Sequence, residues 1–121
     1  MGRMSRQKGK RGERECAAEL SALLGDSVSG RRGVQFAGGP DSPDVVLTGS
    51  NGERVRLHVE AKRTETLNVY KALDQARADA PDGVPAIVWH RRNGRESVVI
   101  CATESLAAIA QEIAKHIAAR K

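Results

Sequence analysis

Residues 54–62, which read Arg-Val-Arg-Leu-His-Val-Glu-Ala-Lys, decide the fold of this chain. With the two-residue period of a β-strand, the apolar side chains of this stretch fall on one face and the polar side chains on the other. The apolar face consists of Val55, Leu57, Val59 and Ala61, and the polar face of Arg54, Arg56, His58, Glu60 and Lys62. The apolar face predicts a strand anchored on a core. Glu60 and Lys62 are two residues apart, so they project in the same direction and can share a metal ion, a water or a phosphate.

A second strand, predicted over Asp44–Leu47, begins with a carboxylate directly after Pro43. The segment between the two strands, residues 48–53, contains Asn-Gly, a frequent hairpin turn. We therefore expect the strands to be antiparallel neighbours, with the start of the first beside the end of the second. That pairing places Asp44 next to Glu60 and Lys62.

The first helix contributes a third carboxylate. Its apolar stripe consists of Cys16, Ala17, Leu20, Leu23 and Leu24. This stripe predicts a helix over residues 10–24 that ends at Gly25. Glu13 falls within the stripe and points toward the core, where a charge needs a partner. Glu15 and Glu19 lie off the stripe, and we interpret them as solvated helix charges.

The remaining pattern completes an αβββαββα order in a single domain. The other predicted elements are a strand over Arg31–Phe36, a helix over Asn68–Ala80, strands over Val84–His90 and Ser97–Cys101, and a helix capped by Thr103. This order indicates a mixed β-sheet flanked by helices, of the α/β class bordering on α+β. With 121 residues, the chain is expected to form one domain over residues 9–121, preceded by a flexible basic arm over residues 1–8.

Composition suggests a polyanionic partner. The formal net charge is +5, and residues 1–14 are particularly basic. DNA, RNA and an anionic membrane surface fit this charge equally well, and an ordinary basic tail is the simplest alternative. The sequence has no apolar run of membrane-spanning length and no hydrophobic segment after its charged start, so we expect a cytoplasmic protein without a membrane anchor. Its small core, with one Phe, one Tyr and one Trp, favours a homodimer.

The gathered side chains suit phosphodiester chemistry. Hard divalent ions such as Mg²⁺ bind carboxylates, keep several waters and accept phosphate oxygens. Such an ion lowers the pKa of a bound water and stabilises charge on the phosphate, and a neighbouring ammonium can orient the attacking water. Glu13, Asp44, Glu60 and Lys62 supply these groups.

These residues carry a resemblance to a known family. Pro43-Asp44 followed by Glu60-Ala61-Lys62 resembles the PD-(D/E)xK nuclease motif, and residues 8–15, KGKRGERE, resemble the opening of archaeal-type Holliday junction resolvases. The resemblance implies a restriction-endonuclease-like core and a homodimer that cuts four-way DNA junctions with Mg²⁺, or with Mn²⁺ in its place. The implied metal ligands are Glu13, Asp44, Glu60 and the Ala61 backbone carbonyl, and the implied catalytic lysine is Lys62.

Three questions stay open at this point. The loop at residues 38–42 and the helix after Thr103 do not match the family pattern, so flaps, ends or single strands are alternative substrates. PD…ExK alone also occurs by chance, and a non-catalytic nucleic-acid-binding module is the alternative to an enzyme. His58 and Gln75 are possible accessory residues. His58 could be a general base, although a substrate contact or a solvated histidine is the simpler interpretation. Gln75 could reach the lysine or the substrate phosphate, although an exposed helix glutamine is the simpler interpretation. The expected phosphate contacts are Lys8, Lys10, Arg11, Arg31 and Arg32.

Overall fold

The computed structural model describes residues 2–24, 28–32, 44–49 and 52–118, with side chains described for residues 11–23, 44–49 and 52–117. Within these residues the order of elements is αβββαββα, as predicted from the sequence. The helices are α1 (Gly2–Leu24), α2 (Val69–Asp79) and α3 (Leu106–Ala118), with a short 3-10 helix η2 (Thr103–Ser105). The strands are β1 (Val28–Arg32), β2 (Val45–Gly49), β3 (His58–Arg63), β4 (Ala86–Arg91) and β5 (Val98–Ile100). None of the described helices is long and apolar enough to cross a membrane.

The five strands form one mixed sheet in the order β1-β2-β3-β4-β5. β3 and β4 run parallel, and the other neighbouring strands are antiparallel. The predicted pairing of the two central strands is confirmed, because Val45 lies opposite Val59 and an antiparallel bridge joins Thr48 to Arg54. The parallel pair is connected through α2, as parallel strands require a crossover.

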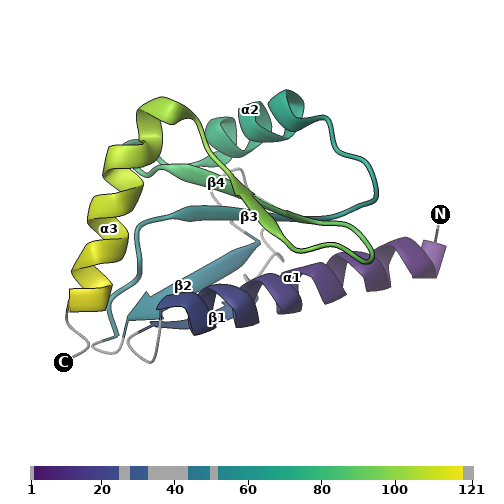
Figure 1. The fold of residues 1–121 in the computed structure, drawn as a ribbon, viewed down its shortest axis with the longest axis horizontal. Coiled ribbons are helices and arrows are strands. Elements are labelled where there is room, and N and C mark those ends of the chain that lie inside the picture. Colours follow the sequence, from purple (N-terminus) through teal and green to yellow (C-terminus); the bar gives the residue numbers. More distant parts are fainter. Residues whose placement is uncertain (1, 25–27, 33–43, 50–51, 119–121) are drawn as a thin grey trace.

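Helices cover both faces of the sheet (Figure 1). On one face, α1 and α3 pack onto the larger core cluster, to which they contribute Cys16, Ala17, Leu20 and Ile109. On the other face, α2 buries Ala72, Leu73 and Ala76 against Ala86 and Val88 of β4. Asn68 caps α2 by accepting a hydrogen bond from the Lys71 N–H. Side chains that alternate along β3 therefore point either toward α1 or toward α2.

Several predicted boundaries are wrong. The helix expected from residue 10 begins at Gly2 and so includes residues 2–8, whose expected flexibility stays a prediction. Their Arg, Lys, Gln and Met residues favour helix without contributing to an apolar stripe, which is why periodicity did not detect them. The first strand is β1, Val28–Arg32, rather than Arg31–Phe36, and residues 33–36 lie outside the described residues.

The central strand is also shorter than predicted. The Leu57 N–H bonds to the Val55 carbonyl in a tight turn, and the Arg56 N–H donates to Glu112 of α3 at 2.9 Å. These contacts take residues 55–57 out of regular pairing, so β3 begins at His58. At the last helix, Thr103 begins η2 instead of capping α3.

The apolar stripe of α3 is only partly buried. Ile109 belongs to the core and Ile113 packs against it. Leu106 and Ile117 are 54% and 41% exposed. The homodimer expected from the small core stays a prediction.

Candidate functional site

Asp44 and Glu60 are in contact where β2 begins beside β3. The Asp44 N–H donates to the Val59 carbonyl at 2.9 Å, which fixes the backbone register at this point. The Asp44 side chain accepts a hydrogen bond from the Ala61 N–H at 2.9 Å and shares a second one with the Glu60 carboxyl. The proximity predicted from the Asn-Gly hairpin is therefore confirmed.

The two carboxyl groups have opposite pKa shifts. Burial, together with the hydrogen bond and the charge of Glu60, raises the pKa of Asp44 to about 7, against the Ala61 N–H, which lowers it. Burial also acts to raise the pKa of Glu60, but hydrogen bonds with His58 and Asp44 and the charges of His58 and Lys62 outweigh it, so the Glu60 pKa is lowered. Below a pH of about 7 the pair therefore favours one proton, held on Asp44.

Glu13 approaches this pair from α1. Its side chain is half-buried, and its charge contributes to the raised pKa of Asp44. The buried Cys16 thiol, one turn along the helix, has its pKa raised by burial and by the charges of Glu19, Asp44 and Glu13, so Asp44 and Glu13 both lie near it. Among the described residues, no three His, Cys, Asp or Glu side chains come close enough to hold a metal ion. Glu13 is thus an electrostatic neighbour of the Asp44–Glu60 pair.

Lys62 and Ala61 extend the site along β3. Lys62 is half-buried, and its charge helps to lower the pKa of Glu60. It lies in register with His90 of β4. Ala61 contacts Asp44 through its N–H. The roles of Lys62 as catalytic lysine and of the Ala61 carbonyl as a metal ligand stay predictions.

The two accessory candidates have different environments. His58 is 1% exposed, so its interpretation as a solvated surface residue is wrong. Its Nε2 lies 3.2 Å from Glu60 Oε1, and its backbone N–H donates to the Pro85 carbonyl. Gln75 is exposed on α2, whose buried side carries Ala72, Leu73 and Ala76. Among the described residues, no hydrogen bond or ion pair joins Gln75 to the carboxylate pair.

The expected phosphate contacts are on α1 and β1. Lys8 and Lys10 are in the first half of α1, and their side chains lie outside the described residues. Arg11 is exposed and lies 3.4 Å from Glu15. Arg31 and Arg32 end β1 opposite Val46 and Val45, at the same end of β2 as Asp44. Their side chains also lie outside the described residues.

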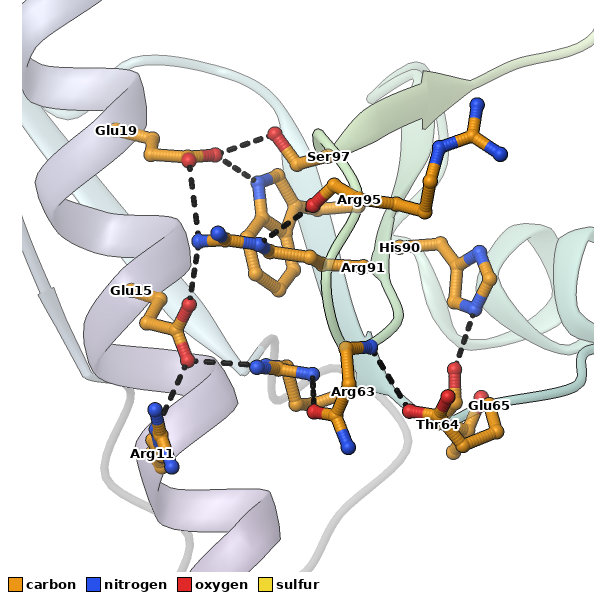
Figure 2. A network of polar contacts seen from close by, with 12 residues as sticks. Arg11, Glu15, Glu19, Arg63, Thr64, Glu65, His90, Arg91, Arg95 and Ser97 are labelled. Atoms are coloured by element: carbon orange, nitrogen blue, oxygen red, sulfur yellow. Dashed lines mark hydrogen bonds and ion pairs between the residues drawn. The ribbon is translucent and has the colours of Figure 1, made fainter.

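The opposite flank of α1 holds an anchor that the sequence analysis missed (Figure 2). Glu15 binds Arg63 at 3.0 Å and Arg91 at 2.8 Å, and Glu19 accepts hydrogen bonds from the Trp89 indole and from Ser97. The interpretation of both glutamates as solvated charges is therefore wrong, because their partners are polar groups on the sheet. One signal was available in the sequence: Arg63 continues the apolar phase of Val59 and Ala61, so it had to point toward α1.

The anchor also fixes how α1 faces the sheet. A Cβ atom at Gly12 would lie 2.6 Å from the Cβ of Arg63, so the helix approaches β3 as closely as a glycine allows. Glu15 is held by Arg63 of β3 and Glu19 by Trp89 of β4, while the charge of Glu13, on the same helix, reaches Asp44. The anchor is thus a structural element that holds α1, and Glu13 with it, against the sheet.

Comparisons of the chain with protein-family models, with curated proteins and with solved structures find no match.

Proposed function

We propose that this chain is a divalent-metal-dependent DNA endonuclease with a restriction-endonuclease-like core, acting on branched DNA in the manner of a Holliday junction resolvase. The observation that carries the proposal is the hydrogen-bonded Asp44–Glu60 pair, with the Lys62 ammonium two residues further along the same face of β3. Two partly buried carboxyl groups in contact, one of them with a raised pKa, are typical of functional sites.

The residues present fit a hard divalent cation. All the candidate side-chain ligands are carboxylates, the donors that Mg²⁺ and Mn²⁺ prefer. The pKa of Asp44 is raised partly because Glu60 and Glu13 crowd it with negative charge, and a cation would relieve that crowding. We assign the cation to Asp44 and Glu60, with the Ala61 carbonyl as a further ligand. We propose that Glu13 joins them only when the cation is bound, because without it no three carboxylates of the described residues form a group that could hold a metal ion. When bound, the ion would lower the pKa of a water and stabilise negative charge on the phosphate.

Other side chains would orient the attacking water, stabilise charge on the phosphate and bind the DNA backbone. Lys62 orients the attacking water and balances charge that develops on the scissile phosphate, in an in-line displacement with inversion at phosphorus. The basic groups of α1 and β1 hold the DNA backbone without reading sequence: Lys8, Lys10, Arg11, Arg31 and Arg32. A homodimer would present two such sites and could nick a four-way junction in pairs.

The test is cleavage of a panel of labelled substrates at equal concentration, with and without Mg²⁺ or Mn²⁺. The panel contains a four-way junction, a flap, a nicked duplex, a linear duplex and a single strand. We expect metal-dependent cleavage that is fastest on the four-way junction. Fastest cleavage of flaps, ends or single strands would keep the nuclease and change its substrate. Salt-sensitive binding without product under either metal would indicate a non-catalytic binding module instead.

Variants test the assignment of roles. Asp44→Asn and Lys62→Ala should each reduce cleavage by about 10³-fold or more while leaving junction binding in Ca²⁺ largely intact. The control is Lys71→Ala, which removes an exposed lysine of α2 without touching the site. Equal loss of binding and cleavage in the Lys62 variant would show that the lysine has a binding role only.

A further inference from the structure

His58 is a buried polar ring whose side chain makes one hydrogen bond within the described part of the chain. It is 1% exposed, and its Nε2 lies 3.2 Å from Glu60 Oε1. Its Nδ1 is buried and has no hydrogen-bond partner among the described residues. A buried polar atom without a partner costs about 1–3 kcal/mol, so an apolar side chain would fill this place more favourably. The histidine therefore needs an explanation other than packing.

The contact with Glu60 supplies that explanation. A glutamate carboxylate has no proton to donate, so the donor at this 3.2 Å contact is the His58 Nε2–H. The same carboxyl group shares a hydrogen bond with Asp44, and Asp44 in turn accepts from the Ala61 N–H. Each group in this chain of hydrogen bonds is held by the next, from His58 on β3 to the start of β2.

We propose that His58 is a positioning residue, whose Nε2–H holds one oxygen of Glu60 so that the carboxylate is oriented for a divalent cation. The inference rests on the proposed function, because it assigns Glu60 to metal binding. A hydrogen bond from a buried ring restricts the rotation of a ligand side chain, and such supporting contacts commonly change metal affinity about 10–100-fold. His58 itself contacts neither the metal nor the DNA in this role.

Three proteins test the inference: the wild type, His58→Leu and His58→Gln. Leucine fills similar space without a donor, and the amide of glutamine can donate from nearly the position of Nε2. The first measurement is Mn²⁺ binding to the DNA-free protein by titration calorimetry. We expect His58→Leu to weaken Mn²⁺ binding about 10-fold or more and His58→Gln to restore it to within about 3-fold. The concentration of Mg²⁺ that gives half-maximal cleavage should shift in the same order.

A second measurement does not depend on a variant that folds. The ¹⁵N spectrum of the imidazole in the metal-free wild-type protein should show a proton on Nε2 of His58 and coupling of that proton to the Glu60 carboxyl. A proton on Nδ1 alone would overturn the inference. So would equal Mn²⁺ affinities for the wild type and for a folded His58→Leu. A wild-type protein that binds neither Mn²⁺ nor Mg²⁺ would instead overturn the proposed function and, with it, the role assigned here.

Discussion

The two flanks of α1 carry glutamates in opposite electrostatic settings. On one flank, burial acts to raise the pKa of Glu15, but the hydrogen bond from Arg63 and the charges of Arg63, Arg91 and Arg11 outweigh it, and the pKa is lowered. On the other flank, burial, the contact with Glu60 and, last, the charge of Glu13 raise the pKa of Asp44 to about 7. On one flank arginines lower the pKa of a carboxyl group, and on the other neighbouring carboxylates help to raise one.

The difference separates ionised groups that stabilise the folded protein from ionised groups that destabilise it. Glu15 is worth most when ionised, because two guanidinium groups from different strands converge on it (Figure 2). Asp44 is worth most to folding when it is protonated, because ionisation places like charges side by side. Functional sites often carry such a cost. Substitutions on the two flanks should therefore change stability in opposite directions.

The largest effect is expected at Glu15. Glu15→Ala leaves Arg63, whose side chain is 6% exposed, without its carboxylate, and should lower the free energy of unfolding by about 2–3 kcal/mol. The stabilisation from Glu15 is present above the ordinary carboxyl pKa of 4.5 and is lost as pH falls through its lowered value in the folded protein. Urea unfolding at pH 7 measures the loss. Glu96→Ala, which removes the exposed partner of Arg95, is the control and should leave the midpoint unchanged. Equal effects of the two substitutions would show that the anchor is no more than a surface ion pair.

A gain in stability is expected at Asp44. The folded protein holds the Asp44 proton more tightly than the unfolded chain, with a pKa of about 7 compared with 3.8. The contribution of this proton to the free energy of unfolding is therefore lost as pH rises between these two values, and above them it no longer changes with pH. Asn cannot ionise and can still accept from the Ala61 N–H. In the presence of a chelator, Asp44→Asn should be more stable than the wild type by about 2 kcal/mol at pH 8. The gain is limited because the pKa of Glu60 is lowered in the folded protein while that of Asp44 is raised. Near pH 4 Asp44 is protonated in the folded wild type, so the two proteins should be almost equally stable.

Urea unfolding midpoints measured from about pH 4 to pH 8 check this dependence. Adding Mg²⁺ at pH 8 should stabilise the wild type and not the variant, since only the wild type retains both carboxylates of the pair. An Asp44→Asn protein that is less stable than the wild type at pH 8 would mean that the carboxylate has a structural role.

The sequence predicted the carboxylate side of this comparison better than the anchor side. Alternation in residues 54–62 and the Asn-Gly turn were enough to bring Asp44 to Glu60, because both signals are local and a one-residue shift would expose the apolar face. The apolar stripe of the first helix is also a local pattern, and it placed Glu13 toward the sheet. The order of elements followed from periodicity and turn residues alone.

The anchor could not be predicted in the same way, because it depends on contacts between residues far apart in sequence. Glu15 is separated from Arg91 by 76 residues, and only the tertiary arrangement of α1 over β4 brings them together. Burial of His58 was missed for a similar reason: strand alternation assigned it to the polar face, and α2 covers that face. Regular alternation identifies which face a residue occupies, but not what covers that face.

The smallest effect is expected at Gly12, which lies between the two flanks. In an open helix position, Gly→Ala stabilises by about 1 kcal/mol, because alanine loses less backbone entropy. At Gly12 the added Cβ would lie 2.6 Å from the Cβ of Arg63, close to the strand backbone, so α1 must move away from β3. We expect the two effects to leave Gly12→Ala less stable by about 1 kcal/mol in urea unfolding. Ala18→Gly, on the exposed side of the same helix, measures the difference in helix propensity between alanine and glycine without any change in packing. Cleavage should fall in Gly12→Ala and not in Ala18→Gly, because a displaced α1 carries Glu13 away from Asp44. A Gly12→Ala protein that is stabilised and fully active would show that the close approach of α1 to β3 is not required.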